Sequence, residues 1–152
     1  MKLFMTFNPH IENYSTKKLL NDFRYALQKY YRKELGRRYF KYVDNQYDVA
    51  IFEETGKKFF EKLDGSTLLK EYLEMNIDFK KEPHLHIIAD VPTDVGTNFF
   101  NSLKNTLESM YPSLTTDFQL IGNDADEINV WNYCSKEDTP IITKQDLCNN
   151  HI

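Results

Sequence analysis

The chain has few of the residues that mark secreted or membrane proteins. Its 152 residues include only two cysteines, Cys134 and Cys148, which provide no disulfide framework. No apolar segment near the N-terminus resembles a signal peptide or a membrane span. These absences predict a protein of a reducing, cytoplasmic compartment. We expect one domain over residues 1–152, because the length supports a hydrophobic core and no repeat or linker divides the chain.

The sequence also lacks an excess of basic residues. Its formal net charge is −4 at pH 7, which argues against binding nucleic acid by charge alone. The basic residues are nevertheless concentrated between Lys17 and Lys41, where tyrosines are interspersed, whereas the chain after Tyr111 is mainly acidic. This asymmetry predicts a basic face that can meet phosphates. The alternative is an ordinary solvated helix face.

Two familiar ligand-binding motifs are absent. Gly56-Lys57 does not belong to a phosphate-binding loop, because Ile51 stands where the first glycine is required. The acidic segment 124–127 lacks the spacing of a complete calcium loop, and we interpret it as a polar turn.

Hydrophobic periodicity predicts alternating strands and helices. We expect strands over residues 2–8, 47–52 and 83–89, and helices from Ser15 or Thr16 to Gly36 and from Thr93 or Asp94 to Met110. We further expect a helical insertion over 57–81, a hairpin of strands 118–121 and 128–131, a short helix through Lys136, and a flexible tail over 141–152. This order predicts an α+β fold, in which helices cover an antiparallel sheet of about five strands.

Two histidines lie one residue apart in the apolar strand 83–89. Side chains alternate between the faces of a strand, so His84 and His86 project from the same face. Two such imidazoles are half of a divalent metal site, and an anionic third ligand is expected. Glu53 and Glu54 end the preceding strand, and only one of them can face the histidines. The alternatives are a satisfied core or surface histidine and a solvated strand end.

A tyrosine and a lysine lie three residues apart in the expected C-terminal helix, which places Tyr133 and Lys136 on one helix face. A tyrosine can act as a covalent nucleophile, and a metal that polarises a phosphoryl oxygen lowers the barrier to its attack. The pair carries little weight alone, because the chain has 10 tyrosines. Cys134 is interpreted as a packed thiol, since no histidine lies near it in the sequence.

Three motifs in fixed order resemble those of the HUH-type endonuclease domain of rolling-circle replication initiator (Rep) proteins, as in small circular single-stranded DNA viruses and plasmids. Residues 4–8 approach Phe-Thr-x-Asn with Met5 in place of an aromatic residue, residues 83–86 match Pro-His-hydrophobic-His, and residues 133–136 match Tyr-x-x-Lys. In that family a glutamate at the preceding strand end completes the metal site, and Glu54 is the better match. The resemblance has two departures: about 30 residues separate Glu54 from His84 where the family has a short turn, and we expect no helicase domain, which many such proteins carry after the nuclease.

The resemblance implies metal-dependent cleavage and rejoining of single-stranded DNA at a replication origin, through a 5′-phosphotyrosine intermediate. It implies that Glu54, His84 and His86 hold Mn²⁺ or Mg²⁺, that Tyr133 attacks phosphorus and that Lys136 positions the phosphate. It also implies a ferredoxin-like or RRM-like fold and the host replication machinery as a partner, and leaves a homodimer open. The expected DNA-binding residues are Asn8, Lys29, Arg32, Arg37 and Arg38.

Two alternatives stay open. A single-tyrosine transposase of the same superfamily has a similar length and histidine strand, but usually has glutamine rather than lysine in the tyrosine helix. A non-catalytic nucleic-acid-binding regulator has no need of a phenol beside the histidine strand, so replacing Tyr133 by Phe leaves its function intact.

Overall fold

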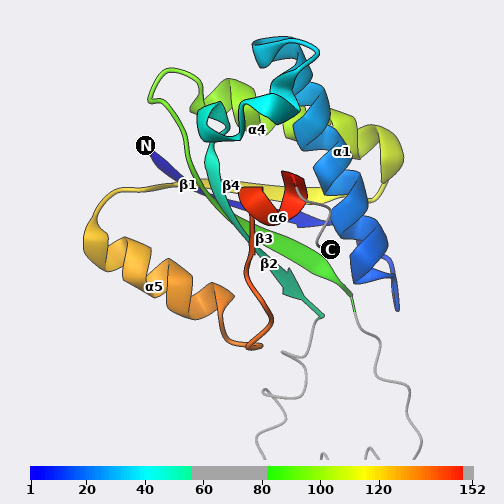
Figure 1. Ribbon diagram of the computed structural model, residues 1–152. Helices are drawn as coiled ribbons and strands as arrows, with labels where there is room; N and C mark the ends of the chain where they lie inside the picture. Colours follow the sequence, from blue (N-terminus) through cyan, green and yellow to red (C-terminus); the bar gives the residue numbers. More distant parts are fainter. Residues whose placement is uncertain (56–81, 149–152) are drawn as a thin grey trace, which may run out of the picture.

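The computed structural model describes residues 1–55 and 82–148. Within them, five strands form one open antiparallel sheet and four α-helices pack on it (Figure 1). The predicted α+β fold with an antiparallel sheet is confirmed. The helical insertion expected over 57–81 lies outside the described residues. Across the described ranges, no helix combines the length and the apolar character needed to cross a membrane.

The central strand of the sheet and its two neighbours carry the candidate site. The strand order is β4-β1-β3-β2-β5. Glu54 is paired with His84, and both Thr6 and Phe52 are paired with His86. The strand hydrogen bonds themselves therefore bring the histidines and the end of the preceding strand together. The strands are β1 (Lys2–Asn8), β2 (Asp48–Glu54), β3 (His84–Asp90), β4 (Thr115–Ile121) and β5 (Ile142–Thr143).

The first helix begins and ends close to its predicted limits. The hydroxyl of Ser15 accepts a hydrogen bond from the backbone N–H of Lys18 at 3.2 Å and caps the helix. Gly36 ends it with φ of 84°, a conformation that favours glycine. The helices are α1 (Thr16–Leu35), α4 (Gly96–Met110), α5 (Asp124–Cys134) and α6 (Lys144–Cys148), with 3₁₀ turns η1 (Tyr39–Lys41) and η2 (Val43–Asn45).

The two faces of the sheet are covered differently. Helices α1 and α4 lie together on one face, and α5 lies on the other (Figure 1). Alternate residues of the strands, such as Leu3, Met5 and Ile87, are fully buried under α1 and α4 in the main core. The other face has a smaller apolar cluster under α5, formed by Ala50, Phe52, Ile88 and Cys134. The remainder of that face carries the polar side chains of the candidate site.

The second strand of the predicted hairpin is wrong, because residues 128–131 lie within α5. The side chain of Asn123 accepts a hydrogen bond from the backbone N–H of Asp126 at 2.8 Å and so caps this helix. Asp124, Asp126 and Glu127 then place negative charge at the positive end of the helix dipole. The cap and the acidic first turn favour a helix over the strand that the apolar residues indicated.

The predicted flexible tail is wrong for residues 142–148, which form β5 and α6. Ile142 and Leu147 are buried in the main core, and β5 pairs with β2. Asp146 accepts hydrogen bonds from the backbone and hydroxyl of Thr143 at 2.9 and 3.0 Å, which fixes the start of α6. Burial of Ile142 and Leu147 thus holds in place a segment of mainly polar composition. Residues 149–152 lie outside the described residues.

Candidate metal centre and tyrosine site

Glu54, His84 and His86 converge where β2 ends and β3 begins. Nε2 of His84 lies 2.7 Å from Oε2 of Glu54, and Nε2 of His86 contacts the same oxygen. The potential ligand atoms of the three residues all lie within 4.8 Å of one another. Strand alternation turns Glu53 to the opposite face. Of the two glutamates considered from the sequence, Glu54 is therefore the one that joins the histidines.

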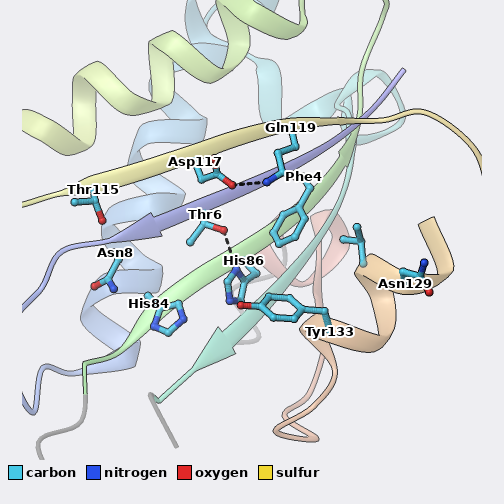
Figure 2. Close-up of a pocket in the computed structure, with 11 residues that line it drawn as sticks. Phe4, Thr6, Asn8, His84, His86, Thr115, Asp117, Gln119, Asn129 and Tyr133 are labelled. Carbon is cyan, nitrogen blue, oxygen red and sulfur yellow. Dashed lines mark hydrogen bonds between the residues drawn. The ribbon is translucent and has the colours of Figure 1, made fainter. Parts of the chain in front are cut away.

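The second nitrogen of each imidazole also has a partner. Nδ1 of His84 donates a hydrogen bond to the backbone oxygen of Glu82 at 2.9 Å, and Nδ1 of His86 lies 2.9 Å from the hydroxyl of Thr6 (Figure 2). Hydrogen bonds of this kind orient metal-binding histidines in proteins. Two imidazoles held with Nε2 toward one carboxylate are a donor set that fits a divalent cation.

Burial and pairing set the charges of this group. Glu54 and His86 are each only 3% exposed. Burial raises the pKa of the Glu54 carboxyl, but hydrogen bonds from His84, His86 and Lys136 outweigh burial and hold the pKa well below its ordinary value. Burial lowers the pKa of His86. It opposes charge on His84 too, but the bonds to Glu54 and Glu82 outweigh it and raise the pKa of His84. These directions favour an ionised Glu54 and a neutral His86, the forms that bind metal, whereas they favour a protonated His84, which has to lose its proton before it can bind.

The predicted tyrosine and lysine lie beside this group: Tyr133 is in the last turn of α5, and Lys136 lies in the turn just past it, so the predicted helix ends two residues earlier than expected. Nζ of Lys136 is 2.6 Å from Oε1 of Glu54 and 3.9 Å from the centre of the Tyr133 ring. The ring centres of Tyr133 and His86 are 5.4 Å apart, and the phenol extends from α5 toward the histidines (Figure 2). Two sets of residues that are distant in the sequence are thus brought together on one face of the sheet.

Cys134 packs in the small apolar cluster with Phe52. It is 5% exposed, and burial raises the pKa of its thiol to about 12. A thiol in this state is a poor nucleophile. The prediction that Cys134 is a packed residue is confirmed.

A pocket of about 500 Å³ lies beside the histidines and extends across β1 and β4 (Figure 2). The carboxylate of Asp117 accepts a hydrogen bond from the Gln119 amide at 2.8 Å on its wall. Most of the lining residues have polar, uncharged side chains, although the surface they expose to the pocket is mainly apolar, so the pocket combines a few hydrogen-bonding groups with apolar contacts and little net charge. The lining residues are Phe4, Thr6, Asn8, His84, His86, Thr115, Asp117, Gln119, Asn129, Val130 and Tyr133.

The candidate DNA-binding residues are divided between the two faces. Asn8 lines the pocket. Lys29 and Arg32 are exposed on α1, which packs on the opposite face of the sheet, and Arg37 and Arg38 are exposed just after that helix. The structure therefore brings Asn8 to the candidate site and leaves these four basic residues away from it.

Sequence reasoning assigned no role to two contacts of the site. The contact between Thr6 and His86 had a signal in the sequence, because Thr6 shares the strand face of Phe4 and Asn8. The hydrogen bonds that join Thr55 to Glu137 had none, because they link segments far apart in the chain.

Comparisons with protein-family models, curated proteins and solved structures give no match.

Proposed function

We propose that this chain is a metal-dependent endonuclease that nicks and rejoins single-stranded DNA at a replication origin, through a covalent link to Tyr133. The observation that carries the proposal is the phenol of Tyr133 beside Glu54, His84 and His86, with Lys136 between the phenol and the carboxylate. A protein that only binds nucleic acid needs no such phenol. The resemblance of the three motifs to HUH-type Rep nucleases supports the same chemistry.

Glu54, His84 and His86 would hold Mn²⁺ or Mg²⁺. When bound, such a cation polarises a phosphoryl oxygen and offsets the charge that develops on it. The protein orients the two imidazoles through Thr6 and the Glu82 carbonyl, and keeps Glu54 ionised through its hydrogen bonds. The ligands are thus held in place by the sheet before substrate arrives.

Tyr133 would be the nucleophile. Its oxygen forms a bond to phosphorus while the bond from phosphorus to the 3′ oxygen breaks. The phenol loses its proton and the departing oxygen gains one, which leaves a 3′-hydroxyl and a 5′-phosphotyrosine. Attack by a 3′-hydroxyl on that phosphotyrosine reverses the reaction and rejoins the strand. Lys136, 3.9 Å from the ring centre, can offset negative charge on the phenolic or phosphoryl oxygens.

The lining of the pocket favours a nucleic-acid strand with accessible bases. The side-chain amides of Asn8, Gln119 and Asn129 offer hydrogen bonds, and the Phe4 ring provides an apolar surface. Proteins that bind single strands combine such stacking and polar contacts. This agrees with a chain whose net charge of −4 does not favour binding by charge alone.

The proposal is tested by incubating the protein with Mn²⁺ and short single-stranded DNAs from its own replicon, followed by a denaturing gel. We expect a cleaved fragment and a protein band shifted by attached DNA. Both should fall by at least about 10³-fold in Tyr133→Phe, because that variant has no nucleophilic oxygen. Tyr42→Phe is the matched control, since Tyr42 is 46% exposed and lies outside the pocket.

Two results would contradict the proposal. Cleavage by Tyr133→Phe at the wild-type rate would show that another group attacks phosphorus. Binding without cleavage, across Mn²⁺, Mg²⁺ and several candidate origins, would favour a non-catalytic regulator.

A further inference from the structure

The turn that follows α5 is fastened to the residue just past β2. The backbone N–H of Thr55 donates to the two carboxylate oxygens of Glu137, at 3.0 and 3.1 Å, and the hydroxyl of Thr55 donates to one of them at 2.7 Å. Charge-assisted hydrogen bonds of this type are stronger than neutral ones. One carboxylate therefore holds both donors of Thr55.

Two neighbouring contacts join the same two segments. The hydroxyl of Thr139 donates to the backbone oxygen of Glu53 at 3.0 Å, and Lys136 pairs with Glu54 at 2.6 Å. Glu53 and Glu54 at the end of β2, and Thr55 just past it, are thus each bound by a residue of the segment after α5.

This fastening adds to the other contacts of α5 with the sheet, which include the ion pair of Glu127 with Lys2 and the packing of Trp131 on Phe52. Cys134 is its only buried residue among the described positions of the helix. The last strand pair of β2 is Glu54 with His84, so the N–H of Thr55 has no strand partner in the described sheet and is satisfied by Glu137. Glu137 directly follows Lys136 and lies about one helical turn beyond Tyr133.

We infer that Glu137 is a positioning residue, which fixes Tyr133 and Lys136 relative to Glu54 through its bonds to Thr55. The inference rests on the proposed function for its effect on cleavage. The carboxylate of Glu137 accepts its hydrogen bonds from Thr55. Glu137 therefore fixes the turn that carries Lys136 and that directly follows the helical turn of Tyr133. The metal-binding residues, in contrast, are held mainly by the pairing of β2 with β3.

The expected effect is a selective loss of rate. Glu137→Ala should lower the single-turnover cleavage rate about 10- to 100-fold, because misplacing a reacting group by about 1 Å costs that much. The dissociation constants for Mn²⁺ and for DNA should change by less than about threefold. Glu137→Gln should recover most of the rate, because it keeps an oxygen that accepts from Thr55.

The control is Asp138→Asn, which removes a negative charge from the next residue. Asp138 is exposed and has φ of 54°, a conformation that asparagine tolerates. Its rate should match that of the wild type. Thr55→Val removes the hydroxyl donor, and combining it with Glu137→Ala should add little to the effect of Glu137→Ala alone, because both changes act on one contact.

Alkylation of Cys134 gives a measurement that needs neither DNA nor metal. Cys134 is the last residue of α5 and is buried against the sheet, so Glu137→Ala should accelerate its alkylation in the folded protein, and Asp138→Asn should not. Equal alkylation rates in the two variants would overturn the inference. So would a wild-type cleavage rate in Glu137→Ala, or a loss of metal affinity as large as the loss of rate. If the wild type cleaves no DNA, the proposed function fails, and the alkylation rates still decide whether Glu137 fastens α5.

Discussion

The two faces of the sheet bury different kinds of side chain. Under α1 and α4, residues such as Leu85 and Phe99 are fully buried, and burying apolar surface is favourable in itself. On the opposite face, Glu54 and His86 are buried to nearly the same extent, although burying ionisable groups is costly unless they are paired. One face thus supplies stability. The other keeps perturbed ionisable groups beside a pocket, an arrangement that is typical of functional sites.

The largest loss of stability is expected on the apolar face. Phe99 packs edge-on against Tyr30 and Tyr47, with ring centres 5.0 and 5.2 Å apart. Phe99→Ala should lower the free energy of unfolding by about 3–5 kcal/mol, because it removes a large buried side chain and leaves a cavity. Urea denaturation monitored by circular dichroism measures this change. A loss under about 1 kcal/mol would contradict the contrast between the faces.

On the opposite face, a substitution should weaken metal binding strongly and change the free energy of unfolding little. His86→Ala should weaken Mn²⁺ binding by at least about 100-fold, since loss of supporting residues alone costs 10- to 100-fold. The free energy of unfolding should change by less than about 2 kcal/mol, because Glu54 stays paired with His84 and Lys136 when the imidazole is removed. Isothermal titration with Mn²⁺ and urea denaturation give the two values.

The matched control for that change is His10→Ala. His10 is exposed and its ring contacts Glu82 and Thr115, outside the group of Glu54, His84 and His86. We expect unchanged Mn²⁺ affinity in this variant. Equal weakening in both variants would show that Mn²⁺ binds elsewhere.

The same contrast explains what the sequence could predict. The period-two pattern of residues 83–89 places Leu85 and Ile87 on one face and His84 and His86 on the other, so the strand and half of the metal group follow from sequence alone. The apolar spacing of α1 and α4 likewise predicts the helices that cover the core. These features depend on local patterns, which a sequence records directly.

Other features depend on contacts between distant segments. The position of Tyr133 beside His86 requires α5 to cross the sheet and to be held near Thr55, and no local pattern specifies this. The segment 128–131 is apolar enough to indicate a strand, whereas Asn123 and the acidic first turn make it helical. Ile142 and Leu147 anchor the last described segment through burial, which its polar composition did not indicate.

A smaller effect distinguishes the two cysteines. Cys134 is buried on the face covered by α5, and burial raises the pKa of its thiol to about 12, so its thiolate fraction at pH 8 is roughly a thousandfold below that of an ordinary thiol. Cys148, in α6, is partly exposed. We expect iodoacetamide to label Cys148 first and Cys134 only on opening of α5. Peptide mass spectrometry over time measures the order of labelling. Faster labelling of Cys134 than of Cys148 would show that the end of α5 does not stay packed on the sheet.

The smallest effect is expected from basic residues on the α1 side. Lys29 and Arg32 were expected to bind DNA, yet α1 lies across the sheet from the pocket that Asn8 lines. Replacing both by Ala should change the affinity for a short single strand by less than about threefold. The salt dependence of binding should also stay unchanged, because we expect neither residue to contact a phosphate, and each phosphate contact that is lost would lower the salt slope by about 0.7. Fluorescence anisotropy between low and moderate salt gives both quantities, with Asn8→Ala as the comparison on the site face. A slope lowered by about 1.4 would mean that the strand continues around the sheet onto α1, and the DNA-binding surface would then include both faces.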